Sequence, residues 1–191
     1  VVELHRGIVT PGSGAYIPTE ALWDRSVECR IAGRETRVLS TEDMLTHLCM
    51  HMACDDPFAD KARSLADLVL LLHRMGREID WGKVVSRAET PRISRLLYYP
   101  LLLAQERCGS QVSNGVMTKL SQQAGQTTVT VVLLRRLMPL GLFKDVPGAG
   151  CFPAWVVQRW CEALLSDGSF RRKLRALFLS FEMAESSVEK A

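Results

Sequence analysis

The sequence predicts a mainly helical α+β protein, in which a small antiparallel strand region is followed by a bundle of several helices. Short segments before position 40 alternate apolar and polar residues, as half-buried strands do. Beyond position 40, apolar residues recur at helical spacing. The 191 residues are 47% hydrophobic, which suffices for one sizeable core.

The opening segment, residues 1–8, has the alternation of a strand. Residues two apart in a strand share a face, so Glu3 and His5 are expected to project together. A strand carboxylate can bind a divalent cation, and a neighbouring imidazole can orient it. The same alternation is also typical of an ordinary half-buried strand. Because the chain opens in such a strand and without methionine, we expect the strand region to be the remnant of a larger sheet.

Two more strands are expected over residues 27–31 and 35–39, which also alternate. Ala32-Gly33-Arg34 between them suits the turn of a tight hairpin. A short helical turn around residues 21–23 is expected before this hairpin.

The remainder of the chain is predicted to be helical. Ser40 at an N-cap and Asp43 three residues later form a capping-box-like start, which predicts a helix over residues 41–54. Further helices are expected at residues 58–75, 79–88, 91–108, 116–138, 154–165 and 169–183. Leucine-rich residues 65–72 predict burial of the 58–75 helix on several sides. Pro100 should disturb the 91–108 helix, and β-branched residues at 127–132 make the 116–138 helix ambiguous.

These elements divide the chain into three expected parts: a partial β-rich segment at 1–39, a helical core at 40–108 and a helical extension at 109–191. The net charge of +3 is spread along the chain and does not indicate nucleic acid or a membrane as a partner. Apolar runs fall short of the ~20 residues of a spanning helix. Six cysteines without a CxxC pair suit reduced, buried thiols and a cytoplasmic location.

His47 and His51 are four residues apart on the predicted 41–54 helix, so both rings should lie along one side. They border an apolar stripe that is expected to be centred on Met44, Leu48 and Met52. Helical zinc sites use the same spacing, but no HExxH motif is present. We favour partly buried imidazoles that hydrogen-bond a neighbouring element.

Asp67 lies within the apolar run 65–69, where a buried, unpaired carboxylate would cost several kcal/mol. It is therefore expected to have a partner: Arg63 one turn earlier, or a histidine of the 41–54 helix if the two helices form an antiparallel hairpin. A clasp between Asp67 and His47 or His51 is the preferred interpretation. A His-His-Asp metal site is the alternative.

Four motifs occur in order along the first half of the chain: Val2-Glu3-Leu4-His5, the run from Leu39 to His51, Ser64-Leu65-Ala66-Asp67-Leu68 and Ile79-Asp80-Trp81. In this order and spacing they resemble the uncharacterised nucleotidyltransferases of the polymerase-β-like superfamily. Thr41 stands where that family pattern has a proline.

The resemblance implies a catalytic head that positions a nucleoside triphosphate with a Gly-Ser motif and two aspartates, with a third acid on a neighbouring strand. Glu3 occupies the third-acid position. Such acids hold two metal ions, usually magnesium. The sequence has no Gly-Ser followed by paired acids, because Gly12-Ser13-Gly14 lacks them, so we expect that half to precede Val1. His5, His47, His51 and Asp67 match family positions without an assigned role.

The sequence therefore favours the C-terminal part of a nucleotidyltransferase-like protein, which transfers a nucleoside monophosphate from a nucleoside triphosphate to an unidentified acceptor and is inactive alone. The alternative is a non-catalytic helical interaction module, a degenerate relative of such enzymes. A metallohydrolase that uses His47, His51 and Asp67 is a third interpretation. An exposed edge of the opening strand would also allow a dimer.

Overall fold

The computed structural model describes residues 15–54, 62–88, 90–125 and 128–142, together with Ile8, Cys161, Leu164 and Leu165. The described elements follow in chain order: α1 (Thr19–Arg25), β1 (Val27–Ile31), β2 (Arg34–Val38), α2 (Thr41–Cys54), α3 (Ala62–Met75), α4 (Trp81–Arg87), α5 (Pro91–Cys108), α6 (Asn114–Gln123) and α7 (Thr128–Leu142). The predicted α+β class with a predominance of helix is confirmed.

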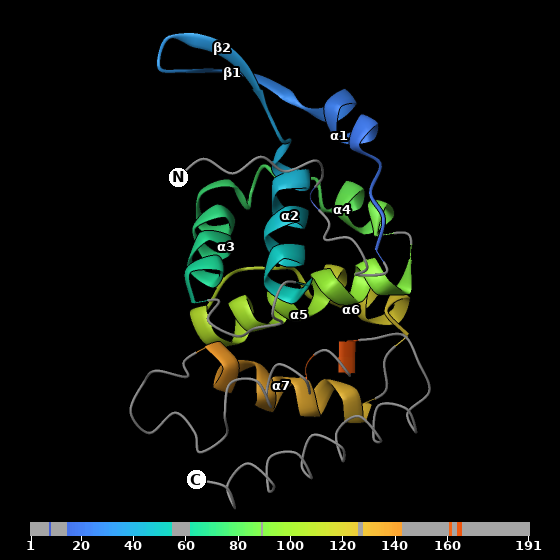
Figure 1. Ribbon diagram of the computed structural model, residues 1–191. Coiled ribbons are helices and arrows are strands. Elements are labelled where there is room, and N and C mark those ends of the chain that lie inside the picture. Colours follow the sequence, from blue (N-terminus) through green and yellow to red (C-terminus); the bar gives the residue numbers. More distant parts are fainter. Residues whose placement is uncertain are drawn as a thin grey trace, which may run out of the picture.

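The helices form the body of the molecule, and the hairpin projects from one end of it beside α1 (Figure 1). Helix α2 runs through the middle between α3 and α4, and α5 crosses near its far end. Contacts join α2 to α3, α4 and α5, and α5 also contacts α6 and α7. One hydrophobic core therefore extends from α2 to Leu165.

The hairpin has a two-residue turn. β1 and β2 pair antiparallel from Val27↔Val38 to Ile31↔Arg34, and Ala32 and Gly33 have φ angles of 50° and 81°. Positive φ at both central residues is typical of the type I′ turn, whose twist matches that of the strands. The prediction of a three-residue connection is therefore wrong, because Arg34 already belongs to β2.

Ser40 caps α2, which has the predicted bounds. The Asp43 backbone N–H donates to Ser40 Oγ at 3.2 Å, and the Ser40 hydroxyl donates to Asp43 Oδ2 at 3.0 Å. A side-chain oxygen thus accepts from one of the N–H groups that have no partner within the helix. The capping residues predicted from the sequence are confirmed.

Helix α2 is buried over a wider face than its sequence indicates. Leu45, Cys49 and Met52 are 0% exposed, whereas Met44 and Leu48 are only partly buried. The prediction that the apolar stripe is centred on Met44, Leu48 and Met52 is therefore wrong for Met44 and Leu48, and of these three only Met52 is fully buried. The centre of the buried face is displaced because α3, α4 and α5 all pack on this helix. The spacing of apolar residues along one helix does not show where its neighbours lie.

Helix α3 is amphipathic instead of buried on several sides. Leu65, Leu68 and Leu72 face the core at 4%, 0% and 6% exposure, whereas Leu70 is 47% exposed and Asp67 is also exposed. The predicted burial of Asp67 is therefore wrong. α3 lies on the outside of the bundle and packs mainly on α2 and α5, so some of its leucines remain in contact with water.

Helix α5 runs through Pro100 without a break. Thr90 caps it by accepting from the Ile93 N–H at 3.2 Å, and Gly109 ends it at φ 68°. A proline inside a helix costs about 3 kcal/mol through the lost hydrogen bond and a clash. Burial of the neighbouring residues Tyr99 and Leu101, both 0% exposed, offsets this cost, so the predicted disturbance is wrong at the level of secondary structure.

Two helices occupy the region predicted as one helix at 116–138. α6 ends at its C-cap Ala124, and Gly125 follows with a φ of 58°. The β-branched residues Thr128 to Val132 lie in α7. Arg95, only 7% exposed, donates to the Ala124 carbonyl at 3.2 Å and to the Leu165 carbonyl at 2.7 Å. A cation at the C-terminal carbonyls of a helix is favourable, so Arg95 stabilises the end of α6.

The other predictions fall wholly or largely outside the described residues. They are the opening strand with Glu3 and His5, the 154–165 helix apart from Cys161, Leu164 and Leu165, and the 169–183 helix. No helix within the described ranges is long and apolar enough to cross a membrane. The five described cysteines are free thiols. Cys49 and Cys161 are buried as predicted, whereas Cys108 is exposed, so the predicted burial is wrong for that residue.

Leu68 and Leu70 offer a matched test of the face that α3 presents. Leu68→Ala should lower the free energy of unfolding by about 2–5 kcal/mol, because it removes a fully buried side chain. Leu70→Ala should lower it by about 1 kcal/mol or less, because the side chain is half exposed. Urea unfolding followed by circular dichroism measures both, and equal losses would contradict this packing of α3.

Cysteine reactivity tests the burial of the core. Burial raises the pKa of the Cys49 thiol, so it stays protonated and unreactive at neutral pH, whereas Cys108 is exposed. Iodoacetamide should modify Cys108 in the native protein and Cys49 only in urea, as read by peptide mass spectrometry. Native labelling of Cys49 at the rate of Cys108 would show that α2 is not enclosed as described.

Candidate functional site

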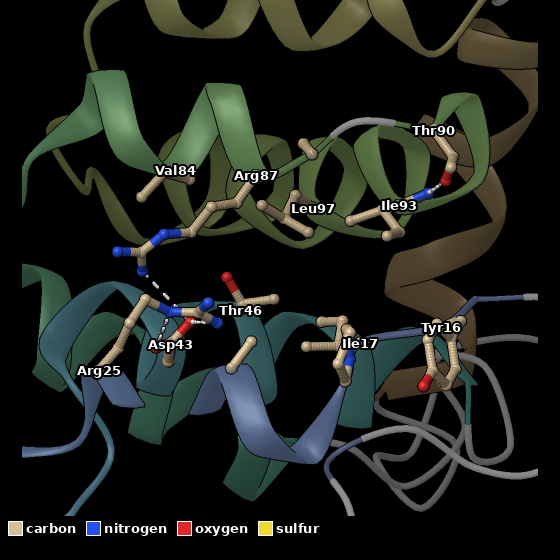
Figure 2. Close-up of a pocket in the computed structure, with 13 residues that line it drawn as sticks. Tyr16, Ile17, Arg25, Asp43, Thr46, Val84, Arg87, Thr90, Ile93 and Leu97 are labelled. Atoms are coloured by element: carbon tan, nitrogen blue, oxygen red, sulfur yellow. Dashed lines mark hydrogen bonds and ion pairs between the residues drawn. The ribbon is translucent and has the colours of Figure 1, made fainter. Parts of the chain in front are cut away.

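Two arginines from different helices converge on the carboxylate of Asp43 (Figure 2). Arg25, at the end of α1, donates from Nε to Oδ2 at 2.8 Å and from Nη2 to Oδ1 at 3.0 Å. Arg87, at the end of α4, donates from Nη1 to Oδ1 at 3.2 Å. The side chain of Asp43 is 4% exposed, whereas those of Arg25 and Arg87 are 28% and 27% exposed. The carboxylate is buried, and the two cations reach the surface.

This cluster, Arg25–Asp43–Arg87, carries one net positive charge. The hydrogen bond to Asp43, followed by its charge, raises the pKa of Arg25 against the opposing effect of burial. Three hydrogen bonds use fewer than half of the N–H groups that two guanidiniums carry. The cluster therefore keeps both charge and donors for an additional anion.

Two of the resembling motifs meet beside this cluster. Glu42 Oε1 accepts from the Asp80 backbone N–H at 3.1 Å, which joins the start of α2 to the start of α4. Asp80 in turn caps α4 by accepting from the Lys83 N–H at 3.1 Å, and that hydrogen bond holds the pKa of Asp80 below its usual value. The start of α2 is thus fixed against α4, which carries Arg87.

A pocket of about 260 Å³ lies beside the cluster, between α1, α2, α4 and the start of α5. Figure 2 shows Arg25, Asp43 and Arg87 at one end of it and Tyr16 and Thr90 at the other. Apolar side chains line the length between the two ends: Ile17, Val84, Ile93 and Leu97. A charged end, an apolar middle and a hydroxyl-bearing end are the usual components of a small-molecule site, although this pocket is slightly smaller than most.

A second pocket, of about 370 Å³, lies between α5 and α6 and includes Arg135 of α7. Its lining is mostly uncharged, and Arg135 pairs there with Glu106. The guanidinium charge is thus balanced. The first pocket is the stronger candidate, because Arg25 and Arg87 share the single carboxylate of Asp43 and keep a net positive charge.

The histidines predicted as a pair do lie together. The rings of His47 and His51 stack with their centroids 6.0 Å apart and an interplanar angle of 24°. His47 is partly buried and His51 exposed. Asp67 lies on the exposed side of α3, so burial gives no reason for the predicted clasp. Glu3 and His5 fall outside the described residues.

No group of three or more metal-ligating side chains occurs in the part of the chain that the structure describes. The described residues therefore do not themselves compose a magnesium site or a His-His-Asp site.

Sequence reasoning missed Arg25, Arg87 and the pocket. Asp43 was singled out only as a helix-capping residue. Arg25 is 18 and Arg87 is 44 residues away from it, and neither has a local pattern that distinguishes it from the other 22 lysines and arginines of the 24. The sequence offered one signal, an acidic residue in the first turn of a helix that was expected to pack against its neighbours. A carboxylate buried in this way requires a cationic partner.

A model of the family described as uncharacterised nucleotidyltransferase matches residues 1–109. This range covers more than half of the 191 residues and contains all four resembling motifs, so the chain belongs to that family. No curated protein and no solved structure matches the chain. The matched range also includes Arg25, Asp43 and Arg87 and ends one residue beyond α5.

The arrangement around Asp43 predicts an order of stability losses. Asp43→Asn should lower the free energy of unfolding by about 2 kcal/mol, because two guanidiniums then lack their carboxylate. Arg25→Gln, which removes two hydrogen bonds, should cost more than Arg87→Gln, which removes one. Chemical unfolding measures all three.

Arg63→Gln is the control for this series. Arg63 is exposed on α3, on the other side of α2 from α4 (Figure 1), and its loss should change stability by less than about 0.5 kcal/mol. A loss for Arg63→Gln as large as that for Asp43→Asn would mean that the cluster is not a specific stabilising contact.

Proposed function

We propose that this chain acts in the transfer of a nucleoside monophosphate from a nucleoside triphosphate to an acceptor, and that its helical core binds the acceptor. Membership of the nucleotidyltransferase family supports the reaction class. The observation that carries the role of the helical core is the pocket beside Arg25–Asp43–Arg87, which lies within the matched range.

In this proposal Glu3 supplies the third carboxylate of a magnesium site. The resemblance of Val2-Glu3-Leu4-His5 to the family motif supports this role. The sequence has no Gly-Ser followed by paired acids, so transfer requires a segment that supplies them, and the chain alone should be inactive. Magnesium would neutralise charge on the phosphates in such a site. The helical core would hold the acceptor in a fixed orientation, which lowers the entropic cost of the reaction.

Reconstitution tests this proposal. The chain is fused to a segment with the Gly-Ser motif and paired acids, taken from upstream of Val1 or from another family member. It is then incubated with each nucleoside triphosphate, magnesium and a metabolite extract as the source of acceptors. Pyrophosphate release should fall by about 100-fold or more in Glu3→Gln, because one carboxylate is lost from the site of charge neutralisation.

Glu28→Gln is the matched control, because Glu28 lies on the hairpin with its side chain 84% exposed. Equal release by the two variants would remove Glu3 from the site. No release from any fusion, with binding of a protein partner instead, would overturn the proposed transfer and favour a non-catalytic interaction module.

A further inference from the structure

We propose that the pocket beside Arg25–Asp43–Arg87 binds a small acid with an apolar body, and that this acid is the acceptor of the proposed transfer. An ionised oxygen of the acid would form a bond to the α-phosphorus of the nucleoside triphosphate, the bond between the α- and β-phosphates would break, and pyrophosphate would leave. Only the assignment of this acid as the acceptor rests on the proposed function. The ligand chemistry rests on the pocket itself.

The charged end of the pocket selects an anion. Two guanidiniums share one buried carboxylate, which leaves one positive charge at that end. Guanidinium groups bind carboxylates and phosphates through paired N–H donors. Asp43 holds both groups in place before a ligand arrives, so fewer side-chain rotamers are lost on binding. Asp24 lies close enough to raise the pKa of Arg25 further, but it is exposed and does not line the pocket.

The middle of the pocket selects an apolar body. Val84 and Leu97 are each 1% exposed and Ile93 is 5% exposed, and they form one wall opposite Ile17 (Figure 2). That wall is already out of water, so the apolar surface that a ligand could still cover is mainly on the partly buried Ile17. A ring or branched chain would cover this surface, at about 25 cal/mol for each Å² removed from water, and a hydrated inorganic anion would not.

The far end of the pocket offers hydroxyl groups. Thr90 Oγ1 accepts from the Ile93 N–H, which leaves its hydroxyl proton able to donate. Tyr16 lies at the same end on the opposite side of the pocket (Figure 2), and 77% of its surface is exposed. Thr46 Oγ1 already donates to the Glu42 carbonyl at 2.8 Å. A polar group at the far end of the ligand would therefore meet donors from Thr90 and Tyr16.

This arrangement disfavours two other ligand classes. A polycationic acceptor would meet the net positive charge of Arg25–Asp43–Arg87. A triphosphate would fill the charged end but would place charged oxygens against Val84, Ile93 and Leu97, where they would lose water without a partner.

Binding to the intact chain of 191 residues tests the ligand class without requiring transfer. Four probes are titrated by calorimetry: benzoate, phenyl phosphate, inorganic phosphate and benzylamine. We expect benzoate or phenyl phosphate to bind at least tenfold more tightly than inorganic phosphate or benzylamine. Arg87→Gln should weaken that binding by about tenfold, whereas Arg63→Gln, which removes the same charge on the other side of α2, should leave it unchanged.

Arg87→Lys separates recognition from net charge. It keeps the positive charge but removes the fork of donors, so affinity should fall although the charge is retained. A native circular dichroism spectrum of both Arg87 variants at the temperature of the titration ensures that a loss of affinity reports on the pocket and not on unfolding. If either variant unfolds, the unaltered chain is titrated with phenyl phosphate and followed by NMR. Chemical-shift changes at Thr90 and Val84 then show whether the ligand binds in this pocket.

The outcomes separate this inference from the proposed function. Tighter binding of inorganic phosphate and ATP than of the phenyl compounds would overturn the acceptor assignment and make the pocket a polyphosphate site. Binding that Arg87→Gln does not change, or the absence of binding by all probes, would overturn the inference altogether. Neither result bears on pyrophosphate release by the reconstituted fusion, which alone decides the proposed transfer.

Discussion

The buried carboxylate of Asp43 is the constraint on which the arrangement of the helices around the pocket depends. Its side chain is 4% exposed, so it requires compensating charge and hydrogen bonds. Arg25 of α1, Arg87 of α4 and Ser40 before α2 supply them. The carboxylate thereby joins three segments that are distant in the sequence, and the pocket forms where these segments meet.

The central position of α2 explains why this compensation occurs at one end of the bundle. Three helices cover α2, so its first turn cannot leave Asp43 in water. The capping hydroxyl of Ser40 also donates to the Asp43 carboxylate, and packing buries that carboxylate. The cost of that burial is offset by two arginines that reach the surface, and the same two arginines can contact a ligand. A requirement of folding has in this way produced a positively charged pocket end.

Local rules predicted the elements whose causes are local. The cap of α2, the bounds of α2 and α5 and the presence of the hairpin followed from Ser40, Pro91, Gly109 and Gly33, because each of these residues acts on its immediate neighbours. The break at Gly125 and the continuity of α5 through Pro100 were not predicted. At those positions, a backbone preference competes with packing, and the sequence does not state the strength of the packing.

The sequence by itself determined the mainly helical α+β fold class and the family motifs. It also determined the side-by-side histidines of α2, because helical spacing alone places His47 beside His51. Only the tertiary structure decided which leucines of α3 face the core, that Asp67 is exposed, and that Arg25 and Arg87 meet at Asp43. The physical reason is separation along the chain. Contacts over 18 and 44 residues depend on how whole helices pack, and no periodicity within a single helix carries that information.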